Sequence, residues 1–217
     1  MKKLLIWGAS GHATVVADIV RMRGEYEIAA FVDERPKAAT SLEGIRVVAS
    51  REAVLRLRDE EGVSDVIVGF GDCASRLKVG RWCREQRFSL ATVLHPSAVM
   101  SPSARIGPGT MIAAGAVVNS AATIGESVIV NTGATVDHHC VVGDGCHLSP
   151  GVHLGGVVVI GELTWIGVGA AVRDHVTIGG HSIVGVGAAV VSDLPDNVVA
   201  YGNPARVVRA VEEARPW

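Results

Sequence analysis

The segment IGESVIVNTGATVDHHCVVGDGCHL, from Ile124 to Leu148, carries an aliphatic residue at every sixth position. The same register continues in both directions, from Met100 to Val190, without an insertion. Each of its sixteen hexads has a sizeable apolar residue at this position, and the position four residues later is usually small. A period of six fits neither an α-helix nor a single long strand. It is typical of the hexapeptide repeat of a parallel β-helix.

Three hexads form one 18-residue coil of triangular cross-section, and stacked coils bury one another's faces. The aliphatic and the small residue are both expected to point into the prism. The glycine that often follows the aliphatic residue removes steric crowding where the backbone turns the corner. Cys140 and Cys146 occupy the small inward position. We therefore expect both to be compact core residues, so the cluster of cysteines and histidines at residues 137–147 is not predicted to bind zinc.

The first 95 residues show a different pattern, in which strand-like segments alternate with helix-like segments. Apolar runs predict strands over residues 3–8, 26–34, 44–50, 64–71 and 89–96. Helical spacing predicts helices over residues 12–24, 51–62 and 74–86. This alternation indicates a small parallel sheet flanked by helices. The expected organisation is an α/β domain (residues 1–95), an all-β helix (residues 96–200) and a closing segment (residues 201–217).

The composition argues against several classes of function. The net charge of −2 is unfavourable for a nucleic acid or an anionic membrane as the main partner. No segment approaches the ~20 apolar residues of a membrane span, and the apolar run after Lys3 is too short for a secretory leader. The four cysteines show no pairing pattern, so we expect reduced thiols and a cytoplasmic protein.

A glycine-containing turn, IWGASGHA, joins the first predicted strand to the first predicted helix. It contains Gly8, Ser10, Gly11, His12 and Ala13, of which Ser10, Gly11 and His12 are the candidate ligand-binding residues. Backbone amides at a helix N-terminus suit a phosphate, but the full G-x-G-x-x-G fingerprint of redox dinucleotide sites is absent. The turn is therefore either the site of a diphosphate-linked ligand or an ordinary tight turn. Asp33 and Glu34 end the second predicted strand, where a carboxylate often meets a ribose or a base.

His138 has the position best suited to chemistry among the eight histidines. It lies two residues after the inward Val136, so its side chain is expected to point outward. One coil later stand Gly155 and Gly156, whose bare backbone lets a ligand approach and presents amide donors. Such a histidine can take a proton from an attacking amine or hydroxyl, and the amides can stabilise an oxyanion. The alternative is an ordinary surface histidine.

Both halves of the chain together resemble one family. The segments that carry the resemblance are GASGHA (8–13), FVDE (31–34), VGFGD (68–72), NTGATVDHHC (131–140), GCHLSPGVHLGG (145–156) and GNPAR (202–206). They are similar to segments of bacterial nucleotide-sugar N-acetyltransferases and sialic-acid O-acetyltransferases of surface-glycan pathways, within the hexapeptide-repeat acyltransferases. The resemblance implies a Rossmann-like N-terminal domain, a left-handed β-helix, acetyl-CoA as co-substrate, and a homotrimer with active sites between subunits.

The resemblance makes His138 the general base. His139 stands where many relatives have a carboxylate that supports the base, and this is a departure from the family pattern. Three candidates for the supporting role remain: Asp137, a carboxylate elsewhere, or His139 as a neutral acceptor. A protonated His139 would instead disfavour protonation of its neighbour.

The resemblance also implies the residues that bind the two substrates. The implied acetyl-CoA contacts are His147, Gly155, Gly156, Val168 and Pro204. The implied nucleotide-sugar contacts are Ser10, Gly11, His12, Asp33, Glu34 and Gly71, the last within the turn from Gly69 to Asp72. The expected reaction is direct acetyl transfer from acetyl-CoA to the amine of a nucleotide-linked amino sugar. The alternatives are a sugar O-acetyltransferase, a zinc hydrase and a non-catalytic β-helix.

The remaining histidines do not form a recognisable metal site. His147 and His153 share one repeat position, and His175 and His181 share another, each pair six residues apart. Members of such a pair lie on different faces of a triangular prism. The zinc sites of γ-type carbonic anhydrases, which are also hexapeptide proteins, use a His-x4-His pair that this sequence lacks. No metal is therefore expected.

Overall fold

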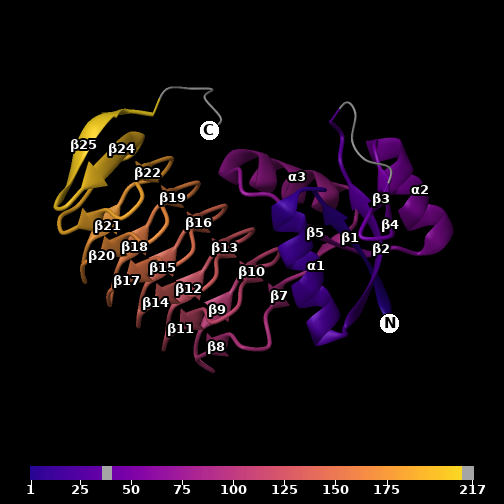
Figure 1. The fold of residues 1–217 in the computed structure, drawn as a ribbon, viewed down its shortest axis with the longest axis horizontal. Coiled ribbons are helices and arrows are strands. Elements are labelled where there is room, and N and C mark those ends of the chain that lie inside the picture. Colours follow the sequence, from indigo (N-terminus) through magenta and orange to yellow (C-terminus); the bar gives the residue numbers. More distant parts are fainter. Residues whose placement is uncertain (36–40, 212–217) are drawn as a thin grey trace.

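The computed structural model describes residues 1–35 and 41–211, and it shows an N-terminal α/β domain beside a long triangular prism (Figure 1). The prism is a left-handed parallel β-helix, as the six-residue period and the family resemblance predicted. Residues 212–217 of the predicted closing segment lie outside the described residues. The predicted fold class is confirmed for both parts of the chain.

The N-terminal sheet has six strands in the order β3-β4-β2-β1-β5-β6. They are β1 (Lys2–Trp7), β2 (Tyr26–Val32), β3 (Ser41–Leu42), β4 (Ile45–Val48), β5 (Asp65–Val68) and β6 (Ser89–Leu90). All neighbours run parallel except β3 and β4. Because the chain continues from β1 to β2 on one side and reaches β5 on the other, a topological switch point lies between β1 and β5.

Three helices cover the two faces of this sheet: α1 (Gly11–Arg23), α2 (Arg51–Glu61) and α3 (Cys73–Glu85). The α2 and α3 helices pack on one face, and α1 packs on the other. Ser50 caps α2 and Asp72 caps α3, each by accepting a hydrogen bond from a backbone amide three residues on. Ser10 precedes α1, but its side chain makes no capping bond. The first amides of α1 therefore have no side-chain cap from Ser10 and can serve a ligand.

The segment SLATVLHP, predicted as one strand over residues 89–96, is two strands in two different sheets. The β6 strand pairs with β5 of the N-terminal domain, whereas β7 (Val93–Leu94) pairs with β10 (Met111–Ile112) of the β-helix. The apolar run does not reveal this break, because Leu90 and Ala91 at the end of β6 are followed closely by Val93 and Leu94 of β7, with a single threonine between them. The first strand of the β-helix therefore precedes residue 96.

Three parallel sheets form the sides of the prism. The first contains β7, β10, β13 (Ile129–Val130), β16 (His147–Leu148), β19 (Trp165–Ile166) and β22 (Ile183–Val184). The second contains β8 (Val99–Met100), β11 (Val117–Val118), β14 (Thr135–Val136), β17 (His153–Leu154), β20 (Ala171–Val172) and β23 (Ala189–Val190). The third contains β9 (Arg105–Ile106), β12 (Thr123–Ile124), β15 (Val141–Val142), β18 (Val159–Ile160) and β21 (Thr177–Ile178). Neighbouring strands are 18 residues apart, which confirms the predicted coil.

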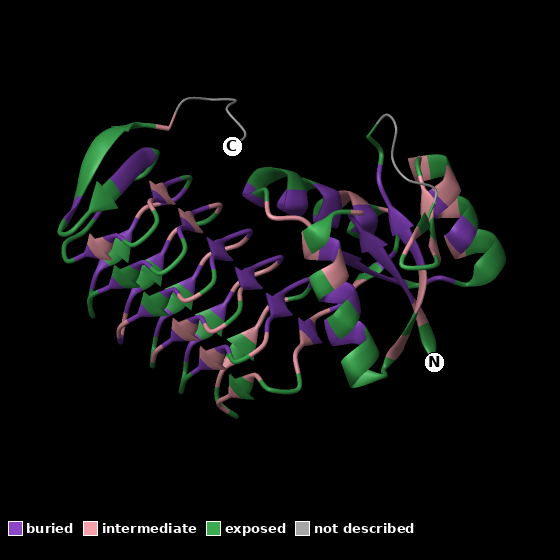
Figure 2. Cartoon of the chain, in the orientation of Figure 1, coloured by how far each residue is buried: buried purple, intermediate pink, exposed green. Residues whose placement is uncertain are grey.

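The interior of the prism is filled by the residues that the repeat places there, and they form one continuous buried cluster. Figure 2 shows that buried residues recur from coil to coil along the prism. Cys140 and Cys146 belong to it and have no exposed surface. The thiol of Cys140 donates to the Gly155 carbonyl at 3.1 Å, and that of Cys146 donates to the Gly161 carbonyl at 3.0 Å. Burial raises the pKa of the Cys146 thiol to about 12, so the thiolate form is strongly disfavoured. The prediction that both cysteines are core residues is confirmed.

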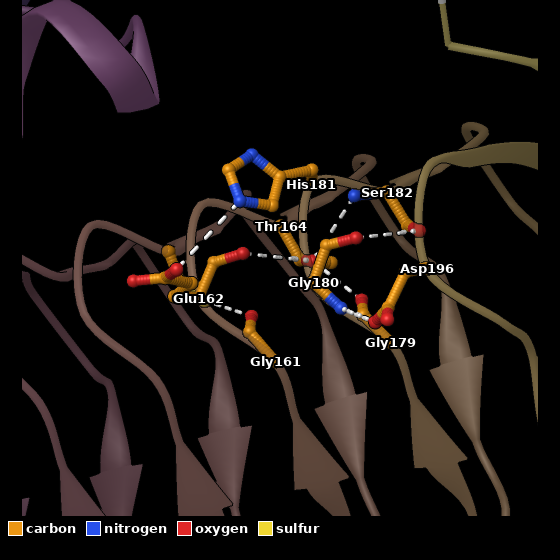
Figure 3. Close-up of polar contacts among 9 residues, drawn as sticks. Gly161, Glu162, Thr164, Gly179, Gly180, His181, Ser182 and Asp196 are labelled. Carbon is orange, nitrogen blue, oxygen red and sulfur yellow. Dashed lines mark hydrogen bonds and ion pairs between the residues drawn. The ribbon is translucent and has the colours of Figure 1, made fainter.

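Hydroxyl residues at the same small inward position tie one coil to the next. Thr164 donates to the Gly179 carbonyl at 2.8 Å and accepts from the Ser182 amide at 3.2 Å (Figure 3). Ser182 in turn donates to the Pro195 carbonyl at 3.0 Å. Because these bonds satisfy backbone atoms at the buried corners, polar side chains are tolerated in an otherwise apolar interior.

The N-terminal domain covers the first sheet of the prism over its first coils. Met111 and Ile129 point outward from that sheet and pack with Ala13 and Val16 of α1 in one buried cluster. The outward side of this part of the prism is therefore apolar core rather than free surface. The packing places the α/β domain on one side of the prism (Figure 1).

A buried arginine ties α3 to the prism. Arg76 is 1% exposed. Its guanidinium donates to five backbone carbonyls at 2.7 to 3.2 Å: those of Ser127, Gly145 and Cys146 in the β-helix, and those of Phe70 and Gly71 in the N-terminal domain. Burial lowers the pKa of Arg76. The planar guanidinium, with its five N–H donors, thus links the two domains through hydrogen bonds at one buried point.

The last coil is followed by a hairpin of β24 (Val198–Gly202) and β25 (Ala205–Ala210). The β24 strand extends the first sheet beyond β22, and β25 pairs antiparallel with it. The peptide bond between Asn203 and Pro204 in its turn is cis. The predicted closing segment, residues 201–217, begins inside β24 of this hairpin.

Candidate functional site

A pocket of about 580 Å³ lies at the carboxyl ends of β1, β2 and β5, beside the topological switch point. Ser10, Asp33 and Glu34, which the sequence predicted as substrate contacts, all line it. Trp7 and Phe70 supply apolar walls. The volume and the mixed lining suit a small organic ligand with polar groups.

Two turns touch at the edge of this pocket. Gly8 has a φ of 134°, and a Cβ on it would lie 2.8 Å from the carbonyl oxygen of Gly69. Only glycine permits that backbone conformation and that approach. The close contact brings the start of α1 and the turn after β5 to the same side of the sheet, where both contribute to the pocket.

Charged side chains surround the pocket in pairs. The Nε of Arg35 donates to the two carboxylate oxygens of Asp33 at 2.8 and 3.0 Å, and this bond holds the pKa of Asp33 below its usual range. Arg51 pairs with Glu34 at 3.1 Å. Lys78 also lines the pocket. Arg35, Arg51 and Lys78 are therefore candidates to receive the negative charge of a diphosphate.

Gly11, His12 and Gly71 do not line this pocket, although the sequence grouped them with Ser10. Successive side chains of a helix point in different directions, so His12, two residues after the cap, points toward the β-helix instead. Its ring centroid lies 6.3 Å from that of His147. The Gly71 carbonyl oxygen lies 3.3 Å from Nδ1 of His147. His12, Gly71 and His147 thus meet at the junction of the two domains.

His147 is 6% exposed and is held on three sides. Its Nδ1 faces the Gly71 carbonyl, its Nε2 lies 3.2 Å from Nδ2 of Asn131, and the Trp165 ring stacks on it with centroids 4.9 Å apart. Because a carbonyl only accepts, Nδ1 carries the hydrogen, and Nε2 accepts from the Asn131 amide. Burial lowers the pKa of His147 to about 3, and the positive charge of Arg76 contributes to that shift.

His12 is also kept neutral at the junction. Burial lowers its pKa to about 4, again with a contribution from Arg76. Its Nε2 is buried and has no hydrogen-bond partner within the described part of the chain. Two neutral histidines and one arginine therefore share the space between the domains.

We expect the protein to lose stability as the pH falls from about 6.5 toward 4. In the unfolded chain both histidines titrate near 6.5, whereas in the folded chain His12 titrates at about 4 and His147 at about 3. In this window the unfolded chain binds more protons, so the free energy of unfolding decreases as the pH decreases. Urea unfolding of the wild type and of His147→Gln at several pH values measures the effect.

The His147→Gln variant should lose stability less steeply, by about one proton in the slope of unfolding free energy against pH. The control is His153→Gln, because His153 is exposed and distant from the junction in the fold. This control should keep the wild-type slope. Equal slopes for wild type and His147→Gln would show that the junction does not exclude protons.

His138 lies exposed on the corner between the second and third sheets. A Cβ on Gly156 would lie 2.6 Å from both Cε1 and Nε2 of His138, so the ring lies directly over the bare Gly156 backbone. This is the placement that the repeat predicted. The Gly155 amide, however, donates to the Val172 carbonyl at 2.9 Å. It is engaged by the next coil and does not serve as the predicted oxyanion donor.

Asp137 contacts the backbone of His138, whereas His139 contacts its ring. Oδ1 of Asp137 accepts from the His138 backbone amide at 2.7 Å and from Nδ2 of Asn119 at 3.0 Å. These hydrogen bonds hold the pKa of Asp137 below its usual range. Nδ1 of His139 lies 3.2 Å from Nδ1 of His138. The hydrogen-bond partner of the His138 ring is therefore His139. The Oδ1 atom of Asp137 instead fixes the backbone of the turn between the second and third sheets.

The five predicted acetyl-CoA contacts do not gather in one place on a single chain. Gly155 and Gly156 lie on the His138 corner, whereas Val168, 48% exposed, lies on the corner between the first and second sheets. Pro204 lies in the hairpin turn and His147 lies at the domain junction. A groove between the β-helices of two subunits would take one wall from each subunit. The role of these five residues in binding acetyl-CoA therefore stays a prediction.

Sequence reasoning missed Arg51, Lys78, Arg76, Asn131 and Trp165. Arg51 begins the helix after β4 and Lys78 lies on the helix after β5, so the rule that ligands bind at the carboxyl ends of parallel strands could have found both. No local signal marks Arg76, Asn131 or Trp165, because their contacts depend on how the domains pack.

The remaining histidines are separate from one another. Nδ1 of His153 lies 2.9 Å from the Thr135 hydroxyl, and His181 lies 3.6 Å from Glu162 (Figure 3). In residues 1–35 and 41–211, no three His, Cys, Asp or Glu side chains form a group that could hold a metal ion. No helix in those ranges is both long and apolar enough to cross a membrane.

Parts of the chain match a family model and a curated protein. Residues 3–82 match the family described as the PglD N-terminal domain. The UDP-N-acetylbacillosamine N-acetyltransferase of Bacillus subtilis (strain 168) is 36% identical over 118 residues, which are 52% of this chain and 52% of that protein. The match thus spans about half the length of this curated relative.

Solved structures are similar over nearly the whole chain. Perosamine N-acetyltransferase from Caulobacter crescentus, in a histidine-to-asparagine variant with CoA and GDP-perosamine bound, is 44% identical with a TM-score of 0.92, covering 96% of this chain and 98% of that chain. The acetyltransferase domain of PglB from Neisseria gonorrhoeae FA1090, in complex with acetyl coenzyme A, is 38% identical with a TM-score of 0.89, covering 95% of this chain and 99% of that chain. The similarity includes both domains.

Proposed function

This chain belongs to the hexapeptide-repeat nucleotide-sugar N-acetyltransferases, and we propose that it transfers the acetyl group of acetyl-CoA to the amine of a nucleotide-linked amino sugar. The observation that carries the proposal is its 44% identity, over 96% of its length, to an enzyme whose structure contains CoA and GDP-perosamine. The pocket at the switch point and the histidine over bare backbone are the two features that such a reaction requires.

In the proposed reaction the free amine of the sugar attacks the thioester carbonyl carbon, and a new C–N bond forms. The C–S bond then breaks and CoA leaves as a thiolate. Nε2 of His138 accepts the proton that the amine nitrogen loses and returns it to the departing sulfur. Because the thioester is already activated, correct placement of the two substrates supplies much of the rate, and no nucleophilic Ser or Cys is involved.

The nucleoside diphosphate part of the sugar substrate is proposed to occupy the pocket of about 580 Å³. The start of α1 offers backbone amides to a phosphate, and Arg51 and Lys78 offer positive charge. Asp33 lies at the carboxyl end of β2, where it suits a ribose or a base edge. The sugar would extend from this pocket toward the base of a neighbouring chain.

We propose that the active site is shared between copies of the chain in a homotrimer. In a triangular prism, the corner between the second and third sheets lies opposite the first sheet, which the N-terminal domain covers. Within one chain the prism thus separates His138 from the nucleotide pocket. Val99 and Val141 point outward from the second and third sheets and are 60% and 45% exposed, which suits contact with another prism.

The reaction is proposed to take place in the cytoplasm. All four cysteines of the chain, Cys73, Cys83, Cys140 and Cys146, are free and buried. Thiols are maintained in this state in the cytoplasm, whereas oxidising compartments favour disulfides.

Acetyl-CoA turnover against a panel of sugars tests the proposed function. The panel contains UDP-, GDP- and CMP-linked amino sugars, the matching nucleotide sugars with a hydroxyl in place of the amine, and free sialic acid. We expect release of CoA thiol with an N-acetylated nucleotide sugar as the product, detected by mass spectrometry, only when an amine is present. Acetylation of the hydroxyl compounds, or no turnover with any amino sugar, would overturn the proposal.

A further inference from the structure

We propose that His139 is the positioning residue of the base, and that it acts as a neutral hydrogen-bond acceptor for Nδ1 of His138. The inference rests on the proposed role of His138 as general base. The two Nδ1 atoms lie 3.2 Å apart, and the rings meet edge to face with centroids 5.4 Å apart. Two imidazoles at this distance form a hydrogen bond when one Nδ1 donates and the other accepts.

The requirement for a free lone pair on the catalytic nitrogen determines which ring donates. Nε2 of His138 lies over the bare backbone of Gly156, where a ligand can approach. For Nε2 to accept a proton from an amine, the hydrogen of the neutral ring must be on Nδ1. Nδ1 of His139 must then be the acceptor, with its own hydrogen on Nε2.

No other side chain takes this role in the described part of the chain, where His139 alone has a hydrogen bond to the His138 ring. Oδ1 of Asp137 is occupied by the His138 backbone amide and by Asn119. The coil above contributes the uncharged residues 155–157, and the coil below contributes the uncharged residues 119–121. The charged or titratable side chains near this corner are Asp137 and, two coils further on, Arg173, Asp174 and His175.

The chemical consequence is a base supported without a fixed negative charge. When His138 takes the proton from the amine, its imidazolium donates from Nδ1 to a neutral imidazole. A carboxylate in the same place would favour the protonated base more strongly through its charge. Replacing His139 by an acid should therefore alter the pH dependence of turnover, whereas a neutral acceptor should not.

The backbone at residue 139 allows this to be tested cleanly. His139 has a φ of 58°, a left-handed conformation that glycine and asparagine adopt more readily than other residues. His139→Gly removes the acceptor without adding backbone strain. His139→Asn keeps a neutral acceptor in its amide oxygen, and His139→Asp supplies a charged one. The three variants separate hydrogen bonding from charge and from backbone effects.

The experiment measures kcat and kcat/KM for acetyl transfer across pH in the wild type and the three variants. We expect His139→Gly to lower kcat about 10- to 100-fold, the loss typical of a hydrogen bond to a charged group. His139→Asn should recover most of this rate with the wild-type pH profile, and His139→Asp should move the acid limb to higher pH. The inference fails if His139→Gly keeps the wild-type rate or if His139→Asn is as slow as His139→Gly.

Nitrogen-15 spectra of the resting, histidine-labelled protein provide a readout that needs no turnover. We expect His138 of the wild type to carry its hydrogen on Nδ1 and to shift toward the Nε2–H tautomer in His139→Gly. A wild-type His138 with its hydrogen on Nε2 would overturn this inference even in an active enzyme. An Nδ1–H tautomer in a protein that acetylates no amino sugar would instead count against the proposed function alone.

Discussion

Replacing His138 by asparagine is expected to lower kcat for acetyl transfer by about 10²- to 10⁴-fold, the contribution typical of a positioned general base. Asparagine is polar and of similar size, but its amide cannot take up the proton that the attacking amine loses. KM for acetyl-CoA should change little, because the loss concerns a proton transfer rather than binding. Steady-state release of CoA thiol at saturating concentrations of both substrates measures the effect.

The matched control is His175→Asn. His175 lies on the same corner two coils further on, its side chain is 70% exposed, and its φ of 59° suits asparagine. This variant should keep the wild-type kcat. If His138→Asn also kept kcat within about threefold of the wild type, His138 would not be the base, and the proton would have to go to another group or to solvent.

Replacing Arg76 by methionine is expected to lower the free energy of unfolding by about 3–5 kcal/mol. Methionine preserves the apolar stem of the side chain but removes every donor, so five carbonyls from two domains lose a buried partner. Each buried acceptor that is left unsatisfied retains its desolvation penalty. Urea unfolding followed by circular dichroism at neutral pH measures the loss.

Arg84→Met provides the comparison from the same helix. Arg84 also reaches from α3 to the β-helix, where it forms an ion pair with Glu126, but its side chain is 51% exposed. Exposed ion pairs stabilise little, so this variant should lose less than about 1 kcal/mol. Equal losses in the two variants would mean that burial of the Arg76 guanidinium does not stabilise the domain junction.

The β-helix could be predicted from the sequence because its rule is local. A residue six positions from another occupies the equivalent position on the next side of the prism, so the repeat assigned Cys140 and Cys146 to the interior. The same rule placed His138 outside and Gly156 beside it, 18 residues later. These assignments need only the spacing of residues along the chain.

The α/β domain was predictable in outline and less so in detail. Alternating apolar and amphipathic segments predicted its strands and helices, and the carboxyl ends of its strands predicted Ser10, Asp33 and Glu34 as pocket residues. The segment over residues 89–96 was misassigned as one strand, because Leu90 and Val93 belong to strands of different sheets. Periodicity reports that a segment is buried, but not which sheet it joins.

The sequence alone thus predicted a parallel β-helix, an α/β domain and the outward position of His138, since each follows from residues near one another or at a fixed spacing, and the family resemblance added the left hand of the helix and the Rossmann-like character of the domain. It left open what supports the base, and it placed His12 and Gly71 with the nucleotide. The grouping of His12, Gly71 and His147 came from the docking of one domain on the other. The contact between His138 and His139 came from the backbone of one corner. Spacing along the chain does not encode the packing between domains or the direction of a side chain at a turn, because both depend on contacts that form only in the folded protein.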